Sequence, residues 1–242
     1  SGYTHIDTAA AYENEEFVGA GIKRSGIRRS DVFITTKLWN NVRGYDETIA
    51  ACEESLKKLG TDYLDLYLIH WPNPLKFRSC WKEKNAETWR AFEELYKSGK
   101  VRAIGVSNFC ERHLDALLET AEVVPSVDQI RLCPGDVDEE TVAYCKNKGI
   151  LIEAYSPLGS GKAFGSEKIK TLADKYGKSI SQICLKWCLQ NGFLPLVRST
   201  SEEHIIENAD IFDFELEAAD ISALSEMTGE CGIHSNPDEK MF

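Results

Sequence analysis

Four side chains that could move or hold a proton lie at the ends of the first apolar runs of the chain: Asp7, Tyr12, Lys37 and His70. A tyrosine with an ordinary pKa of about 10 is a slow proton donor at neutral pH. An ammonium group beside it favours the phenolate, and Lys37 could supply that group while Asp7 keeps Lys37 charged. His70 could donate a hydrogen bond to a carbonyl oxygen. Together these residue types suit the proton-transfer step of a carbonyl reduction.

The elements that must position these side chains are short β-rich runs alternating with amphipathic helical stretches. The expected strands are Tyr3–Ile6, Val32–Thr36, Leu64–Ile69, Ala103–Val106, Val127–Ile130, Leu151–Ala154 and Leu194–Val197. The expected helices are Glu15–Ser25, Asp46–Leu59, Glu83–Ser98, Glu111–Thr120, Glu139–Asn147, Glu167–Tyr176 and Ser179–Gln190. This alternation predicts an α/β fold with a parallel sheet.

The number of expected strands helps to distinguish between the possible α/β folds. A closed barrel needs eight strands, whereas a doubly wound sheet usually has about six. The chain enters a strand at once after Ser1-Gly2, with no helix before it. We therefore expect a (β/α)8 TIM barrel that lacks its first strand and first helix, as a single, N-terminally incomplete domain over residues 1–242. The polar residues that follow each strand would then meet at one rim.

The composition excludes several classes of protein. A net charge of −11 and a pI near 5.0 argue against a nucleic-acid surface, and no apolar run reaches the length of a membrane span. The eight cysteines stand singly, which predicts free thiols and a cytoplasmic protein. Cys184 and Cys188 share a helix face, but no second pair has metal-ligand spacing, so we expect no metal site. We expect a monomer acting on a small molecule.

The sequence around these residues resembles the aldo-keto reductase family from end to end. Within the family it is most similar to the microbial 2,5-diketogluconate reductase and prostaglandin F synthase-like branch. The segments that carry the resemblance are Gly2–Glu15, Thr35–Leu38 with Trp39, Ile69–Pro72, Gly105–Phe109, Ala154–Gly159 and Ile206–Leu216. The last of these resembles the final helical segment of the family.

The resemblance implies a barrel that binds NADPH in an extended pose, without a Gly-rich Rossmann turn. It makes Asp7, Tyr12, Lys37 and His70 a catalytic tetrad, with Tyr12 as the acid in reduction. Further positions are implied to bind the cofactor. Ser107, Asn108 and Gln129 would hold the nicotinamide carboxamide, and Tyr155 would stack under the nicotinamide ring. Ser156, Leu158 and Ser160 would lie in the strand end and loop that close over the dinucleotide. Arg198, Ser199 and Thr200 would take the 2′-phosphate, and Glu207 and Asn208 would lie near the adenine.

Two departures from the family pattern concern the cofactor. Arg198 stands where the family usually has Lys, which preserves the charge and allows bidentate phosphate contact. His204 stands where the family usually has Arg, and a histidine is mostly uncharged at neutral pH. We therefore expect a weaker preference for NADPH than is typical, with NADH as an alternative cofactor.

The pocket and the activity leave alternatives open. Trp39 and Trp71 could line an apolar substrate pocket or simply pack in the fold. The leading hypothesis is reduction of aldehydes or ketones to alcohols with NAD(P)H. The alternative is a non-catalytic NADP-binding regulatory module or an inactive, truncated reductase. A hydrolase ranks last, because neither metal-ligand spacing nor a nucleophile elbow is present.

Overall fold

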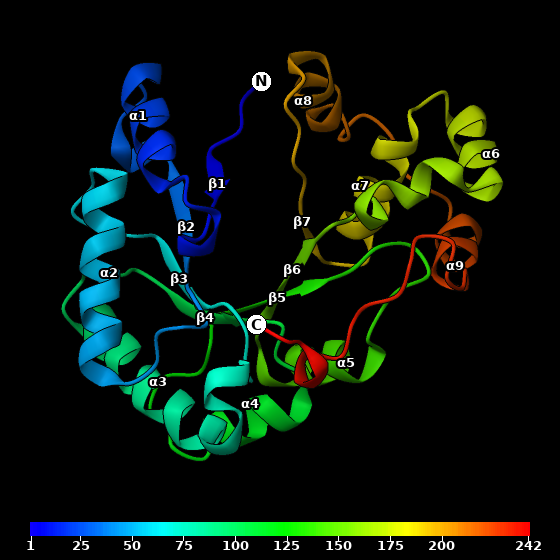
Figure 1. The fold of residues 1–242 in the computed structure, drawn as a ribbon. Coiled ribbons are helices and arrows are strands. Elements are labelled where there is room, and N and C mark those ends of the chain that lie inside the picture. The colour runs from blue at the N-terminus through cyan, green and yellow to red at the C-terminus, as the bar shows by residue number, and fades with distance from the viewer. The chain divides into compact units, whose positions relative to one another are not determined.

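The computed structural model describes residues 1–242, in which seven strands alternate with helices (Figure 1). The strands are β1 (His5–Asp7), β2 (Phe33–Leu38), β3 (Leu66–Ile69), β4 (Ile104–Ser107), β5 (Val127–Arg131), β6 (Leu151–Tyr155) and β7 (Leu194–Leu196). They follow one another in the sheet in chain order, from β1 to β7. The predicted fold class is confirmed as an α/β chain with (β/α)8 barrel topology that lacks one strand.

Nine α-helices connect and follow these strands. They are α1 (Glu15–Ser25), α2 (Tyr45–Leu59), α3 (Trp81–Lys97), α4 (Glu111–Leu118), α5 (Glu139–Lys148), α6 (Glu167–Tyr176), α7 (Ile180–Gln190), α8 (Glu202–Ala209) and α9 (Ala218–Ser225). The prediction for Ile206–Leu216 is wrong in extent, because α8 ends at Ala209 and a separate α9 follows. The side-chain amide of Gln182 donates to the Glu207 carbonyl in the last turn of α8 and to the Asp210 carbonyl just after it, so these carbonyls have partners outside the helix.

The chain divides into two compact units. The β1–β4 unit comprises Thr4–Asp128, Lys148–Ile150 and Asn236–Phe242. The β6–β7 unit comprises Ser1–Tyr3, Gln129–Asn147 and Leu151–Ser235.

In the β1–β4 unit the strands pair in parallel; the residues of β1 are half-buried, and those of β2 to β4 are almost all buried. β2 has only its first residue exposed, and all of β3 and β4 is buried. Packing explains the glycine at position 105 in β4, because a Cβ on Gly105 would lie 2.6 Å from the Val127 carbonyl oxygen. Strands buried in this way form a rigid base for the residues that follow them.

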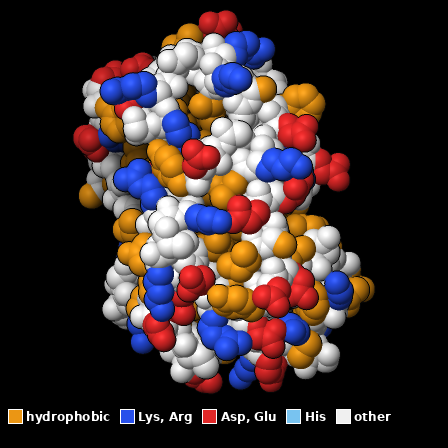
Figure 2. All heavy atoms as spheres, turned by 90° about the vertical axis from the view of Figure 1, so that its left-hand side faces the viewer, with side chains coloured by type: hydrophobic (Ala, Val, Ile, Leu, Met, Phe, Trp, Pro, Cys, Tyr) orange, Lys and Arg blue, Asp and Glu red, His pale blue; other side chains and the backbone are white.

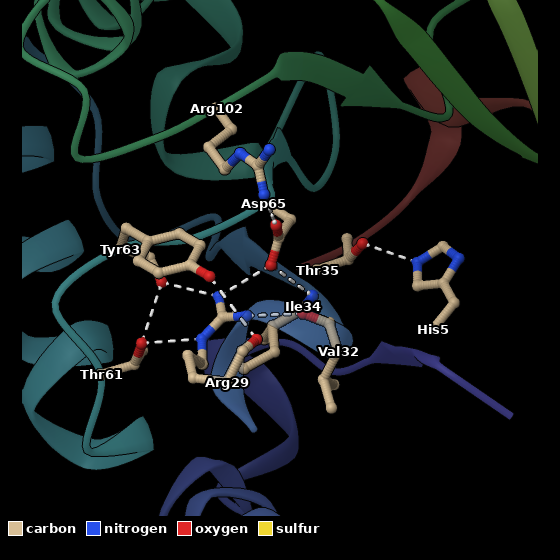
Figure 3. A network of polar contacts seen from close by, with 9 residues as sticks. All are labelled: His5, Arg29, Val32, Ile34, Thr35, Thr61, Tyr63, Asp65 and Arg102. Atoms are coloured by element: carbon tan, nitrogen blue, oxygen red, sulfur yellow. Dashed lines mark hydrogen bonds and ion pairs between the residues drawn. The ribbon is translucent and has the colours of Figure 1, made fainter. Parts of the chain in front are cut away.

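A polar network ties the starts of β2 and β3 together in this unit (Figure 3). The guanidinium of Arg29 donates to Thr61 Oγ1 at 2.8 Å and to the Val32 and Tyr63 carbonyls at 2.6 and 2.9 Å. It also pairs with Asp65 Oδ2 at 2.7 Å, and the same oxygen accepts from the Ile34 amide. Networks at the N-terminal ends of barrel strands serve stability rather than chemistry.

The last residues of the chain are anchored within the β1–β4 unit by Asp238, in the short turn Pro237–Glu239. Asp238 Oδ1 accepts from Asn73 Nδ2 at 2.8 Å and lies 3.0 Å from His113 Nε2, while Oδ2 pairs with Arg112. The Leu75 amide donates to the Phe242 carbonyl at 3.1 Å. These contacts hold the terminal segment against the loop after β3 and the first turn of α4.

The β6–β7 unit is built from β6, β7 and the helices α5 to α9. Ser166 and Ser179 cap α6 and α7, and Gln182 completes a capping box with Ser179. A Cβ at Gly159, which has φ +58°, would collide with the Cys231 carbonyl oxygen, so the loop after β6 requires glycine there. None of the eight cysteines forms a disulfide.

The surface around α1 and α2 carries charges of both signs. Figure 2 shows acidic and basic side chains interspersed on this face, with small apolar areas between them. No helix is both long and apolar enough to cross a membrane.

Candidate active site

The register of β1 and β2 brings Asp7 and Lys37 together. Asp7 is paired with Thr35, and Thr35 and Lys37 point to the same face because alternate residues of a strand share a face. Lys37 Nζ lies 2.5 Å from Asp7 Oδ1 and donates to the Thr8 carbonyl at 2.9 Å. The Lys37 side chain is fully buried, whereas that of Asp7 is 17% exposed. The ammonium is thus compensated on one side by a carboxylate and a carbonyl.

Tyr12 reaches this pair from the turn that follows β1. The turn Ala10–Tyr12 is a single 3-10 turn, closed by the Tyr12 amide donating to the Ala9 carbonyl at 3.0 Å and ended by Glu13 at φ +53°. Lys37 Nζ lies 5.3 Å from the centroid of the Tyr12 ring. Because the tyrosine is 50% exposed, a ligand can approach its hydroxyl while the ring faces the ammonium.

His70 completes the group at the end of β3. Its amide donates to the Leu38 carbonyl at 3.2 Å, and its ring meets the Tyr12 ring edge-on at 5.9 Å. Burial, together with the charges of Lys37 and Arg43, lowers the pKa of His70 to about 3. Nδ1 is buried without a partner. His70 is therefore neutral at physiological pH and can act as a hydrogen-bond donor rather than as a cation.

The end of β4 lies beside His70 in the same unit. Asn108 Nδ2 donates to the His70 carbonyl at 3.0 Å and lies 3.1 Å from Ser107 Oγ. Asn108 has φ +61°, a left-handed conformation that asparagine tolerates. Four non-glycine residues have positive φ, and all follow β1, β4 or β6: Glu13, Asn108, Ser156 and Ser160. Backbone strain of this kind tends to concentrate at functional sites.

Trp39 and Trp71 lie on the His70 side of the unit, and both contact the ring of Phe242. The Trp39 ring is 5.0 Å from the His70 ring and 5.6 Å from the Phe242 ring. The Trp71 ring is 5.1 Å from Phe242. Three apolar rings therefore gather beside His70. Which residue of the C-terminal segment contacts the two tryptophans depends on where the last residues pack.

The β6–β7 unit holds most of the other predicted cofactor residues. Gln129 Nε2 donates to Glu153 Oε2 at 2.9 Å, and both side chains are buried. Tyr155 is the last residue of β6, and Ser156 follows it in a left-handed conformation. Leu158 and Ser160 lie at the start of the 3-10 segment Gly159–Gly165. Tyr155, Ser156, Leu158 and Ser160 belong to the end of β6 or the loop after it, whereas Gln129 lies in the middle of β5 rather than at its predicted end.

The residues predicted to bind the adenosine end lie just before α8 and along it. Arg198, Ser199 and Thr200 follow β7, and the Ser199 hydroxyl accepts from the Ser201 amide at 3.1 Å. His204 and Asn208 are one turn apart on α8, with Glu207 beside them. Asn208 is buried and its Oδ1 has no donor. The first turn carries Glu202 and Glu203, whose charges oppose a phosphate there.

Comparison with known proteins identifies the family. The aldo/keto reductase family model matches residues 1–228. The chain belongs to the aldo/keto reductase family. It is 49% identical to the glyoxal reductase of Bacillus subtilis over 242 residues, which covers 100% of this chain and 85% of the relative.

Solved structures of the family agree with this aldo/keto reductase over nearly its whole length. A point mutant of Gox0644 in complex with NADPH has 38% identity and a TM-score of 0.91, and the match covers 100% of this chain and 86% of Gox0644. The Bombyx mori aldo-keto reductase in complex with NADP has 36% identity and a TM-score of 0.85, covering 95% and 80%. The predicted family and the predicted enzyme class, an NADPH-dependent carbonyl reductase, are confirmed.

Proposed function

We propose that this aldo/keto reductase reduces aldehydes or ketones to alcohols, with Tyr12 as the general acid and Lys37, Asp7 and His70 as its partners. The observation that carries the assignment is the packing of the buried Lys37 ammonium between Asp7 and the Tyr12 ring. The relative named a glyoxal reductase makes glyoxal, a small dialdehyde, the first substrate to test.

The proton chemistry follows from the geometry of the four side chains. Bound NADPH supplies the hydride that adds to the carbonyl carbon. Tyr12 donates its hydroxyl proton to the carbonyl oxygen, so that C=O becomes CH–OH. Lys37 stabilises the resulting phenolate, and Asp7 keeps Lys37 protonated and in place. The neutral His70 donates a hydrogen bond to the same carbonyl oxygen and orients it.

Several features of the chain fit a nicotinamide dinucleotide. In the β6–β7 unit, the unpaired Oδ1 of Asn208 would accept from the amino group of adenine. Arg198 would take the 2′-phosphate together with the Ser199 and Thr200 hydroxyls. Arg198 is the only Lys or Arg in 198–209, and two carboxylates follow it closely. These charges support the expectation that NADPH is preferred over NADH less strongly than is typical.

The remaining cofactor positions are assigned by their places at strand ends. In the β1–β4 unit, Ser107 and Asn108 would bind the nicotinamide carboxamide. In the β6–β7 unit, Gln129 would do the same and Tyr155 would stack on the nicotinamide ring. Ser156, Leu158, Ser160, His204 and Glu207 are further proposed contacts of the dinucleotide.

The test measures NADPH oxidation with glyoxal and with aromatic and aliphatic aldehydes, alongside cofactor titration by quenching of tryptophan fluorescence. We expect saturable oxidation of NADPH and slower oxidation of NADH. Cofactor binding without turnover of any carbonyl would contradict the proposal and support the non-catalytic, nicotinamide-binding alternative.

The four proton-handling residues come from one chain, which supports the expectation of a monomer. Sedimentation velocity of the active protein tests that point, and a stable dimer would contradict it. The eight free cysteines support a reducing compartment such as the cytoplasm.

A further inference from the structure

Arg43 is a buried cation that has no carboxylate partner. Its exposed fraction is 3%, and its pKa is lowered by burial to about 9, which leaves it charged at neutral pH. Buried arginines are usually paired with an acid, since an uncompensated charge is costly. Here the guanidinium donates instead to three backbone carbonyls and one side-chain amide. Such an arrangement indicates a specific task at this position.

The hydrogen bonds of Arg43 join the two loops that carry the candidate pocket tryptophans. Nη1 donates to the Trp39 carbonyl at 3.1 Å and to the Val42 carbonyl at 2.6 Å, and Nη2 donates to the Trp71 carbonyl at 2.6 Å. Trp39 directly follows β2, and Trp71 follows His70 at the end of β3. One planar group thus fixes the spacing between the two loops beside His70.

Helix α3 supports this arrangement through Asn85. Its Oδ1 accepts from Arg43 Nε at 3.3 Å, and its Nδ2 donates to the Pro72 carbonyl at 2.8 Å. Asn85 is buried as well. The loop after β3 is therefore held twice, at Trp71 by the guanidinium and at Pro72 by the amide.

We propose that Arg43 is a positioning residue of the active site, which sets the separation of Trp39 and Trp71 and so determines how well a bulky or aromatic carbonyl fits beside His70. The inference rests on the proposed function, because it assigns the two rings to the substrate pocket. Lysine cannot replace Arg43, since a single ammonium lacks the planar fork that reaches both loops at once.

Arg43 also contributes to the electrostatic surroundings of His70. The charged groups that act on the His70 ring are Lys37 and Arg43, both cations, and the Tyr12 and Trp39 rings pack against it. Two cations disfavour the protonated imidazole, which agrees with a neutral, donating His70.

The experiment compares Arg43→Lys and Arg43→Gln with Arg29→Lys. Arg29 is a matched control, because it also joins β2 and β3 through carbonyls but does so at their N-terminal ends (Figure 3). The readout is the ratio of kcat/KM for an aromatic aldehyde, such as benzaldehyde, to kcat/KM for propanal. This ratio does not change when a variant merely reduces the fraction of folded enzyme.

We expect both Arg43 variants to lower the ratio about tenfold, mainly through KM of the aromatic aldehyde, while Arg29→Lys leaves it unchanged. If the Arg43 variants do not fold, Asn85→Ala removes one of the four hydrogen bonds and should lower the ratio by a smaller factor. An unchanged ratio in a folded Arg43 variant overturns the inference. If neither Arg43 variant folds, an unchanged ratio in Asn85→Ala overturns it. A wild-type protein that turns over no aldehyde overturns the proposed function itself and, with it, this inference.

Discussion

Lys37 is the fully buried charge of the proposed site, and its removal tests the role of the Tyr12 environment. Lys37→Met takes away the cation that faces the tyrosine ring and pairs with Asp7. We expect kcat to fall about 100-fold or more, because an assisted proton transfer is lost. The affinity for NADPH should stay within a few fold of wild type in a fluorescence titration.

The matched control for that change is Lys186→Met. Lys186 is also nearly buried, and its Nζ pairs with Glu215 Oε1 at 2.7 Å in the β6–β7 unit. The Lys186→Met variant should be less stable than wild type but should keep the wild-type kcat. Equal losses of kcat in the two variants would show that Lys37 acts only through folding.

The buried His70 makes a prediction about stability at low pH. Its pKa is about 3 in the native state against an ordinary value of 6.5, so on acidification the unfolded chain takes up a proton before the native chain does. The free energy of unfolding should therefore fall as pH drops below 6.5, by about 2 kcal/mol between pH 7 and 5 from this group alone. His113, with a pKa lowered to about 4, acts with the same sign.

Urea unfolding of wild type and His70→Gln at pH 7 and 5 measures this effect. The variant lacks the titrating group, so its stability should depend less on pH. Parallel behaviour of the two proteins would contradict the buried, neutral His70 of the structure.

At the residue scale, the sequence suggested the groups that are proposed to do chemistry and gave no sign of Arg43, which is proposed to position them. Tyr12 and Lys37 could be singled out because each residue type suits the reaction and each follows a run predicted to be a strand, although Lys37 lies inside β2 in the structure. Arg43 carries no such signal, since its partners are backbone carbonyls that any sequence provides. Phe242 contributes only through long-range packing against Trp39 and Trp71.

At the scale of elements, the loop after β6 offers a comparison between two glycines. Gly159→Ala would force a left-handed alanine, with its Cβ against the Cys231 carbonyl oxygen, whereas Gly161→Ala at φ +94° meets no atom within 4 Å. Both variants place an alanine in a left-handed backbone conformation, which costs stability, but only Gly159→Ala adds a steric clash. We expect Gly159→Ala to be less stable than Gly161→Ala by about 2 kcal/mol in urea unfolding. Equal losses would show that the contact with Cys231 is not restrictive.

The sequence located the ends of most strands and helices to within two or three residues, because buried strands and amphipathic helices differ in the period of their hydrophobic residues. It placed α1 and α6 at the bounds that the structure shows. It gave no helix from periodicity at α8 or α9, and only the family resemblance suggested a helical segment there, which it carried on to Leu216. In the structure α8 ends at Ala209, where the side-chain amide of Gln182 in α7 donates to the Glu207 and Asp210 carbonyls. That ending depends on a tertiary contact, so local periodicity could not reveal it.

At the scale of the whole molecule, the order of the strands in the sheet brings the proposed proton-handling residues together. Strands that follow one another in the sheet deliver Asp7, Lys37 and His70 from β1, β2 and the end of β3, which explains why residues far apart in sequence meet. The fold class could be predicted because alternation and polar strand ends are local features. The division into two compact units could not, since it depends on contacts throughout the chain.

The most direct measurement is single-turnover reduction of glyoxal by Tyr12→Phe, with preformed NADPH complex, beside wild type and Tyr96→Phe. Tyr96 is an exposed tyrosine on α3 and serves as the control. The account predicts that Tyr12→Phe binds NADPH as wild type does but loses at least about 100-fold in the rate of its oxidation, while Tyr96→Phe loses nothing. A Tyr12→Phe protein that oxidises NADPH at the wild-type rate would contradict Tyr12 as the proton donor.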